Sequence, residues 1–298
     1  MRVGGAAEWL LEPATPAELA AAWNAARERG HLPRVLGGGA NTVVDEGILP
    51  GVVIATDRMR RVFRPAAGED DLEARAPRAA IAHDDPARDP RLVAWCGASL
   101  PGLLRAARDL GYRGLEGLVG VPGNVGGGVA MNAGGRWGEM WDVVERVRVL
   151  AADGTLEDLE RAACSPRYRD ANLGGRVIVG AVLRFEPDAR AAIEERMRVY
   201  LTEKRRVQPV TEWSAGCIFK NPDPELSEGR SAGKLVEDCG GKSLARGDAI
   251  VSPLHGNFIV NRGKASAADV FTLMEDLRDL VLEKAGLALE FEVKRWRA

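Results

Sequence analysis

The chain has 298 residues, of which 46% are apolar and 28% are charged, with 41 Lys and Arg against 43 Asp and Glu. This length predicts about two domains, and the composition excludes a disordered, collagen-like or coiled-coil chain. A formal net charge of −2 gives no overall basic field, so we expect no nucleic-acid partner. No apolar run approaches the roughly 18 residues that span a bilayer, so we expect no membrane association.

The cysteines and the N-terminal residues indicate the compartment. The opening MRVGGAAEWLLEP has a short apolar stretch interrupted by Glu8, which is not typical of a secretory signal. The four cysteines are far apart and form no C-x-x-C pair, which predicts reduced thiols and a cytoplasmic location. The three histidines lie at no ligand spacing, so we predict no metal site. We expect a monomer with no obligate protein partner.

The first sixty residues predict a small α/β unit. Thr15-Pro16-Ala17-Glu18 is a capping box with Pro at the first helical position, and Gly30 is the expected stop of that helix. Strands are expected on both sides of the turn Gly37-Gly38-Gly39, at 34–36, 41–44 and 52–55. Residues 64–91 are rich in Ala, Pro and charge, and they predict an exposed insertion.

The remaining chain alternates strands and helices. Strands are predicted at 92–96, 143–150, 155–159, 176–185 and 257–261, and helices at 100–110, 188–205, 232–239 and 266–285. Asp153-Gly154 is a hairpin turn signal, and Gln208-Pro209 marks a domain boundary. A last strand is expected at 287–293. Its alternation places Glu290, Glu292 and Lys294 on one face and does not choose between the two glutamates.

Two glycine-rich stretches are the strongest chemical signals. Glycine occupies every third position from Gly111 to Gly126, and a second glycine turn precedes Asn41. Such backbone lets amide groups approach an anion closely, with Asn41 and Asn132 adding side-chain hydrogen bonds. The two loops together favour a long phosphate-bearing cofactor, although an irregular loop with tight turns stays open. A Rossmann fingerprint fits poorly, because G-x-G-x-x-G is absent and no acidic residue follows a second strand.

Several motifs occur together and in one order. These are GGGANTVV, GLVGVPGNVGGGVAMNAGG, Tyr168-Arg169-Asp170, SAGCIFKNP, AGKLVEDCG, HGNFIVN and LEFEVK. In this order they resemble the UDP-N-acetylenolpyruvoylglucosamine reductase family from about residue 8 to 296. The long glycine stretch is shared with other flavoproteins of the same superfamily, whereas SAGCIFKNP joined to the terminal Glu segment is much more specific.

The resemblance implies an α+β fold with a two-part FAD-binding domain of the vanillyl-alcohol-oxidase type and a C-terminal α+β substrate domain. It implies FAD-binding subdomains at 1–62 and 92–205, with the insertion at 63–91 between them. It also implies a substrate-binding domain at 206–286 and a terminal strand, 287–298, that returns to the active site.

The resemblance also implies which residues hold the FAD pyrophosphate. Two glycine loops supply them: Gly37, Gly38, Gly39, Ala40, Asn41 and Thr42, and then Gly120, Val121, Pro122, Gly123, Asn124, Gly126, Gly127 and Asn132. Ala40 and Asn124 stand where the family usually has Ser and Thr. Main-chain donors neutralise a diphosphate without a basic patch.

The family reaction implied by this resemblance reduces an enol ether that carries a carboxylate, in UDP-N-acetylglucosamine enolpyruvate, with electrons from NADPH. Hydride passes from flavin N5 to the methylene carbon, and a proton completes the product UDP-N-acetylmuramate, a peptidoglycan precursor. Arg169 matches the residue that stabilises the enolate carboxylate. Glu292 matches the assisting glutamate, and Cys217 stands where a Ser proton donor is usual. A thiol, with an ordinary pKa of ~8.5, remains an effective acid near neutrality.

Other residues are candidates for substrate contacts. Tyr168, Lys220 and Asn221 come from the same motifs, while Gln208, Lys234 and His255 are weaker candidates that also fit structural roles. The chain resembles the subgroup without an extra Tyr-bearing loop. Two rival functions stay open: an FAD-dependent oxidase or dehydrogenase that acts on an alcohol, and a non-catalytic sensor of nucleotide sugars.

Overall fold

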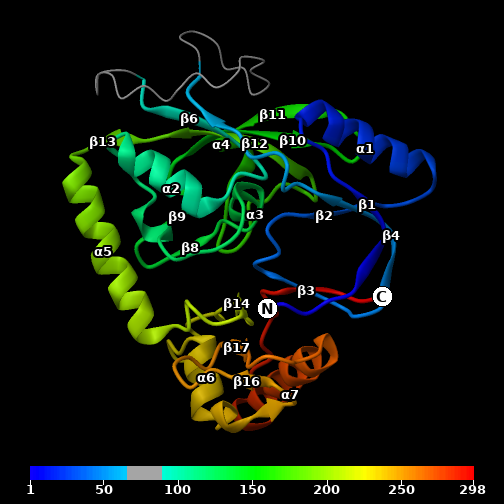
Figure 1. The fold of residues 1–298 in the computed structure, drawn as a ribbon. Helices are drawn as coiled ribbons and strands as arrows, with labels where there is room; N and C mark the ends of the chain where they lie inside the picture. The colour runs from blue at the N-terminus through cyan, green and yellow to red at the C-terminus, as the bar shows by residue number, and fades with distance from the viewer. Residues whose placement is uncertain (66–88) are drawn as a thin grey trace. The chain divides into compact units, whose positions relative to one another are not determined.

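The computed structural model describes residues 1–65 and 89–298, and these divide into two compact units (Figure 1). Unit 1 comprises Met1–Glu8, Gly39–Pro50 and Glu203–Ala298, and unit 2 comprises Trp9–Gly38 and Gly51–Thr202. Most of the insertion expected at 64–91 lies outside the described residues. Because 39–50 groups with the C-terminal residues, the units do not follow the predicted domain boundaries, and the functional division stays a prediction.

Unit 2 is built on a five-stranded antiparallel sheet in the order β11–β10–β12–β6–β5 (Figure 1). Its strands are β5 (Val62–Phe63), β6 (Arg91–Trp95), β10 (Val144–Leu150), β11 (Leu156–Glu160) and β12 (Val177–Arg184). β12 is buried over nearly its whole length, in keeping with its central place. The predicted hairpin is confirmed, since β10 pairs antiparallel with β11 and Gly154 takes φ +87° in the connecting turn.

Capping signals set the ends of the helices in unit 2. In α1 (Pro16–Glu28) the Thr15 hydroxyl accepts the amide of Glu18 at 3.2 Å, which confirms the predicted start. α2 (Leu100–Asp109) begins in the same way at Ser99. The other helices that begin in this unit are α3 (Val125–Ala130), α4 (Arg161–Cys164) and α5 (Arg190–Val207).

Helix α3 lies inside the glycine stretch, where the sequence indicated only a loop. It packs on β12 and β6. A Cβ on Gly126 would lie 2.8 Å from the Cβ of Cys96, at the end of β6, so this glycine allows the helix to approach the sheet. Part of the glycine pattern therefore serves packing rather than ligand binding.

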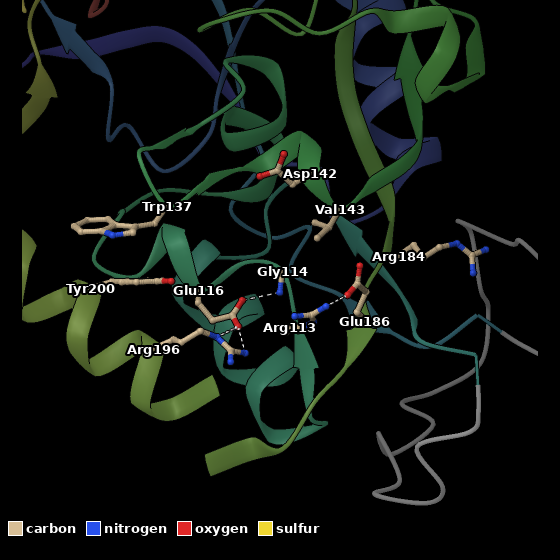
Figure 2. Close-up of a pocket in the computed structure, with 10 residues that line it drawn as sticks. All are labelled: Arg113, Gly114, Glu116, Trp137, Asp142, Val143, Arg184, Glu186, Arg196 and Tyr200. Carbon is tan, nitrogen blue, oxygen red and sulfur yellow. Dashed lines mark hydrogen bonds and ion pairs between the residues drawn. The ribbon is translucent and has the colours of Figure 1, made fainter. Parts of the chain in front are cut away.

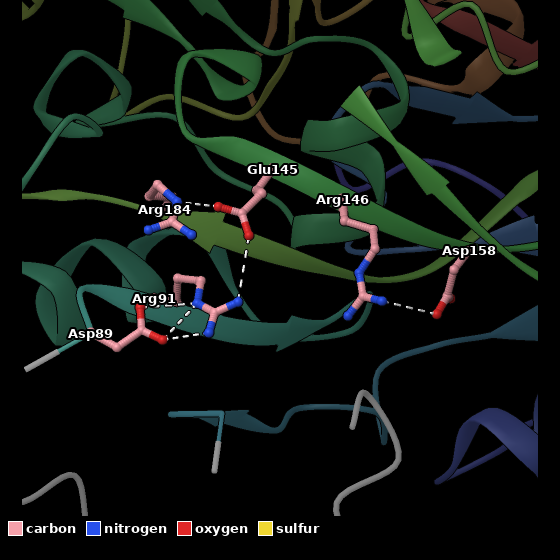
Figure 3. Close-up of polar contacts among 6 residues, drawn as sticks. All are labelled: Asp89, Arg91, Glu145, Arg146, Asp158 and Arg184. Atoms are coloured by element: carbon pink, nitrogen blue, oxygen red, sulfur yellow. Dashed lines mark hydrogen bonds and ion pairs between the residues drawn. The ribbon is translucent and has the colours of Figure 1, made fainter. Parts of the chain in front are cut away.

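One face of the sheet in unit 2 carries a set of ion pairs (Figure 3). Arg91 donates to Asp89 at 2.7 Å and lies 3.5 Å from Glu145, which also binds Arg184. The Arg91 guanidinium holds the pKa of Asp89 below its usual range. These contacts link the first residues described after position 88 to β10 and β12.

Unit 1 contains a four-stranded antiparallel sheet in the order β14–β17–β16–β15. Its strands are β14 (Ser214–Cys217), β15 (Ala245–Arg246), β16 (Ala249–Val251) and β17 (Phe258–Asn261). Helix α6 (Ala232–Asp238) packs against α7 (Ala267–Ala285), and Gly286 ends α7 at φ +68° as predicted. β3 (Thr42–Val44) pairs in parallel with β18 (Lys294–Trp296).

The predicted terminal strand is shorter than expected: within 287–298 only Lys294–Trp296 forms a strand, and residues 287–293 do not. The regular strand is β18, which starts at Lys294, and only Phe291 makes an isolated bridge before it, to Phe219. The alternating apolar side chains of this segment pack into the core with residues of α7 and with residues in and just after β14. They do not mark a strand paired by main-chain hydrogen bonds.

The remaining strands are β1 (Ala6–Leu11), β2 (Arg34–Leu36), β4 (Ile48–Ala55), β7 (Tyr112–Arg113), β8 (Gly134–Gly135), β9 (Gly138–Glu139) and β13 (Glu186–Pro187). The antiparallel sheets with helices packed on them confirm the α+β class. Within the described ranges, no helix combines the length and apolar character needed to cross a membrane.

Candidate functional site

The two glycine loops meet within unit 2. Gly38 follows β2, and Gly123 and Asn124 lead into α3. A Cβ on Gly38 would lie 2.9 Å from the Asn124 Oδ1 and 3.1 Å from the Gly123 Cα, so a larger residue would require Asn124 and the Gly123 main chain to shift. The loops that the sequence analysis paired are therefore neighbours at Gly38.

Main-chain amides at this meeting point can serve an anionic ligand. In the described ranges, no main-chain hydrogen bond is recorded from the amides of Gly38, Gly123 or Asn124. By contrast, the Gly126 amide donates to Cys96 O at 2.8 Å and that of Val121 to Leu118 O at 2.9 Å. The amides of Gly126 and Val121 are thus not available to a diphosphate, although both residues were predicted to hold it.

The other predicted loop residues differ in their surroundings. Gly39 and Gly120 adopt φ +62° and +81°, conformations that favour glycine. Pro122 and Gly127 are exposed and Gly37 is half-buried. Ala40, Asn41 and Thr42 belong to unit 1, where Asn41 O accepts the amide of Lys294 at 2.9 Å.

Asn132 is buried, and its side chain forms hydrogen bonds within the protein. Its Nδ2 donates to Glu139 Oε2 at 2.7 Å and to Arg167 O at 3.2 Å, and its Oδ1 accepts the amide of Trp141 at 3.2 Å. An asparagine amide has two hydrogens, so both are used inside the protein. This favours a supporting role for Asn132 over direct contact with a cofactor.

Arg169 lies in the turn that Asn132 supports. The main chains of Arg167 and Asp170 bond to each other, and Arg169 takes the left-handed conformation at φ +57°. Its Nη2 donates to Gly134 O at 2.9 Å, and its guanidinium carbon lies 4.9 Å from the centre of the Tyr168 ring. A non-glycine residue in this conformation is a strained arrangement of the kind found at functional sites.

Cys217 ends β14 in unit 1, directly after a bulge. The register with β17 shifts between Ser214 and Cys217, and Gly216 within the shift takes φ +81°. Such a bulge redirects the next side chain. Cys217 is half-buried, whereas the thiols of Cys96, Cys164 and Cys239 are buried.

The structure separates the two candidate glutamates. Glu292 is only 8% exposed, and its amide donates to Ile218 O at 2.8 Å, next to Cys217. The side chain of Glu290 is 71% exposed and forms an ion pair with Lys220 at 2.6 Å. Asn41 Nδ2 donates to Glu292 O at 3.2 Å. Burial therefore supports the assignment of Glu292 that the motif register favoured.

The candidate substrate contacts are divided between the units. Lys220 is bound by Glu290, and Asn221 Oδ1 accepts the amide of Ala232 at the start of α6 at 3.0 Å. Tyr168 is exposed. Among the weaker candidates, Lys234 pairs with Asp238 within α6, which fits the structural role. Thus Arg169 and Tyr168 lie in unit 2, and Cys217, Lys220, Asn221 and Glu292 lie in unit 1.

Comparison with known proteins identifies the family. Residues 7–160 match a family described as an FAD binding domain, and residues 208–296 match the UDP-N-acetylenolpyruvoylglucosamine reductase C-terminal domain. The reductase of that name from Moorella thermoacetica is 37% identical over 297 residues, which cover 99% of this chain and 89% of the relative. The chain belongs to the UDP-N-acetylenolpyruvoylglucosamine reductase family. As a member of this family it is an FAD-dependent oxidoreductase.

Further reductase relatives agree over the full length. The Deinococcus radiodurans protein of the same name is 37% identical, with 99% of this chain and 91% of the relative covered. The crystal structure of the Thermus caldophilus reductase is similar with a TM-score of 0.75 at 34% identity, covering 99% of this chain and 94% of that one. The two family models match successive regions of the chain, an FAD-binding domain and then the C-terminal domain of the reductase family, which agrees with the expected fold class.

A cavity of ≈ 290 Å³ in unit 2 is lined by none of the site residues predicted from the sequence (Figure 2). In it Glu116 accepts the Arg196 guanidinium and the Gly114 amide, each at 2.6 Å, and Arg113 pairs with Glu186. Trp137 and Tyr200 stack at 5.0 Å. Arg184 pairs with Glu145, outside the lining, and Asp142 accepts the amide of Glu139. The charged groups of the cavity are thus bound by other groups of the protein, and we assign it no ligand. Its lining is Arg113, Gly114, Glu116, Trp137, Asp142, Val143, Arg184, Glu186, Arg196 and Tyr200.

The sequence analysis did not identify the residues that support the candidate site. Glu139 and Asn257 both hold parts of it through hydrogen bonds, although neither received a role. Asn257 did lie inside the HGNFIVN motif that carried the resemblance. In the described part of the chain, no group of three or more His, Cys, Asp or Glu side chains is arranged to hold a metal.

Proposed function

We propose that this chain reduces UDP-N-acetylglucosamine enolpyruvate to UDP-N-acetylmuramate, with bound FAD and with NADPH as the electron source. The observation that carries the proposal is the connection of the buried Glu292 to the Cys217 segment through Ile218 O at 2.8 Å. Family membership supplies the reaction class, and this connection brings an acid and a carboxyl group to one segment.

The glycine loops suit the cofactor. When bound, FAD supplies the hydride that is added to the methylene carbon of the enolpyruvyl group. The amides of Gly38, Gly123 and Asn124 would donate to its diphosphate, and the absent Cβ at Gly38 leaves space for the two loops to approach each other. In our proposal residues 1–62 and 92–205 hold FAD, and 206–286 and the tail serve the substrate.

Arg169 is proposed to bind the substrate carboxylate. Hydride addition leaves negative charge on the α-carbon, which delocalises into that carboxylate. A guanidinium fork stabilises such charge bidentately, and the contacts of Arg169 with Asn132 O and Gly134 O fix its direction. The bonds are already formed before substrate arrives, so little reorganisation is needed.

Cys217 is proposed to protonate the α-carbon, after which its thiolate recovers a proton from solvent. Glu292 is proposed to assist the charged intermediate from its buried position. Lys220, Asn221 and Tyr168 are proposed substrate contacts. Reaching the substrate with Lys220 requires its ion pair with Glu290 to loosen or to share the charge.

Two measurements test this function against its rivals. The purified protein should show a flavin absorbance spectrum, and repeated turnover of NADPH should require the enolpyruvyl nucleotide sugar. An alcohol oxidase of the same superfamily would be reduced by its own substrate, so anaerobic bleaching of the flavin by NADPH alone separates the two. A sensor of nucleotide sugars would bind the substrate without turnover, and absence of turnover in a flavin-loaded protein would reject the proposal.

A further inference from the structure

Asn257 makes an unusual set of contacts with the segment after Cys217. The side chain belongs to a residue only 3% exposed. Its Oδ1 accepts the amide of Phe219 at 2.8 Å, and its Nδ2 donates to Phe219 O, also at 2.8 Å. Its own carbonyl accepts the amide of Ile218 at 2.9 Å. One residue therefore binds both polar groups of Phe219 and one of Ile218.

The segment needs this support because the regular ladder has ended. β14 stops at Cys217, after the register shift, so residues 218–220 lie beyond the strand. The side-chain amide of Asn257 forms two hydrogen bonds with the main chain of Phe219. These replace the two bonds that a residue of a neighbouring strand would form. Asn257 is itself held in place, since its main-chain amide donates to His255 Nδ1 at 3.1 Å.

The opposite side of the same segment carries the tail. The main-chain amide of Glu292 donates to Ile218 O at 2.8 Å, and the main-chain amide of Lys220 donates to Glu290 O at 2.9 Å. The rings of Phe219 and Phe291 stack between these two bonds at 5.2 Å. Main-chain hydrogen bonds of residues 218–220 thus link the segment that follows Cys217 to the segment that carries Glu292, and Asn257 binds the other side of these residues.

We propose that Asn257 is a positioning residue, which fixes Cys217 and Glu292 relative to each other by bridging the main chain of Phe219. The proposal rests on the proposed function of those two residues. Removing the side chain leaves a buried N–H and a buried C=O without their partners, which is costly enough for the segment to shift. A shift of about 1 Å at a reacting group lowers a rate on the order of 100-fold.

The test separates the two halves of the reaction in the flavin-loaded protein. Reduction of the flavin by NADPH does not use Cys217, whereas reoxidation by the enolpyruvyl substrate does. We expect Asn257→Ala to slow reoxidation by on the order of 10- to 100-fold and to leave reduction unchanged. Asn261→Ala is the matched control: Asn261 is a buried asparagine at the end of β17, whereas Asn257 directly precedes this strand, and the Asn261 side chain binds Met1 O, Gly263 and Ala265 instead.

Asn257→Asp gives a readout that a merely structural role would not move. Ionised aspartate keeps an acceptor for the Phe219 amide but has no hydrogen for Phe219 O, whereas protonated aspartate restores that bond. The reoxidation rate of this variant, divided by that of the wild type, should therefore rise as the pH is lowered. Equal reoxidation rates in wild type and folded Asn257→Ala, or an equal loss in Asn261→Ala, would overturn the proposal.

Alkylation of Cys217 by iodoacetamide, followed by peptide mass mapping, provides a second readout that does not depend on turnover. Asn257→Ala should change the alkylation rate of Cys217, and Asn261→Ala should not. If the wild-type flavin is not reoxidised by the substrate, the proposed function fails. The alkylation rates then still decide whether Asn257 positions the thiol, so the two failures are distinguishable.

Discussion

The amide of Glu292 donates to the carbonyl oxygen of Ile218 at 2.8 Å, and Ile218 follows Cys217 directly in the chain. A carboxyl group near the end of the sequence is thereby joined to a thiol more than seventy positions earlier through one hydrogen bond and one peptide group. This bond contributes to the placement of the two groups that the proposed chemistry uses.

Replacing Glu292 and Glu290 separately should affect different kinetic constants. Glu292 is buried, so Glu292→Gln is expected to lower kcat on the order of 100-fold, with flavin reduction by NADPH unchanged. Glu290 is exposed and bound to Lys220, so Glu290→Gln is expected to change mainly KM for the nucleotide sugar. Steady-state kinetics check both variants, and a larger loss of kcat in Glu290→Gln would reverse the assignment.

Cys217→Ser should retain far more activity than Cys217→Ala, because a hydroxyl still carries a proton and a methyl group does not. The expected loss in the alanine variant is on the order of 100- to 10,000-fold in kcat. Stopped-flow reoxidation of the flavin measures it directly. If both variants lose equal activity while folded and loaded with flavin, the thiol is not the proton donor.

Iodoacetamide should inactivate the wild type by modifying Cys217 first. The other cysteines are buried, and burial raises the pKa of the Cys96 thiol to about 12, so little reactive thiolate forms there. Peptide mapping after partial inactivation checks the site of modification. The Cys217→Ser variant is the control and should resist the reagent.

Gly38→Ala should lower the FAD content of the purified protein. The new methyl group would lie 2.9 Å from Asn124 Oδ1 and 3.1 Å from the Gly123 main chain, so both neighbours would have to shift at the point where the two loops meet. In Gly37→Ala the Cβ meets only the Asn124 Cβ, at 3.8 Å, which is ordinary contact, so a smaller loss is expected. The flavin-to-protein absorbance ratio compares the two, and equal ratios would place the cofactor elsewhere.

Much of the fold follows from local signals in the sequence. Thr15 and Gly286 marked the start of α1 and the end of α7, because a side-chain cap and a left-handed glycine act within one helical turn. Motif resemblance found Cys217 and the region of Glu292. These features depend on neighbouring residues, so they can be read along the chain.

The remainder depends on contacts between distant segments. Glycine spacing did not reveal that Gly126 serves helix packing against Cys96, because that contact is with another strand. Alternation over 287–293 predicted a strand, but those residues bind to 218–220 by only a few bonds. The supporting asparagines, Asn132 and Asn257, bind main-chain groups that no sequence pattern identifies.

Asn132→Ala should reduce substrate turnover through Arg169, even if FAD remains bound. The side chain holds Arg167 O, and thus the turn in which Arg169 has φ +57°. Loss of this bond lets the turn relax and moves the guanidinium. We expect kcat to fall on the order of 10-fold or more and the flavin content to stay near that of the wild type. Loss of flavin in place of activity would restore Asn132 as a direct cofactor ligand.

Stability should fall on the acidic side because of His255. Burial lowers the pKa of this imidazole, while Glu237 opposes the shift and Lys242 adds to it. The unfolded chain then binds a proton, near the ordinary pKa of about 6.5, at pH values where folded His255 stays neutral. The contribution is fully present above that value and is lost as the pH falls through the lower folded pKa. Neutral His255 accepts the main-chain amide of Asn257 through Nδ1, and protonation of Nδ1 would abolish this bond.

Urea unfolding between pH 8 and 5.5 measures the effect of His255 on stability. His255→Asn should flatten the decline, whereas an identical decline in both proteins would show that another group causes it.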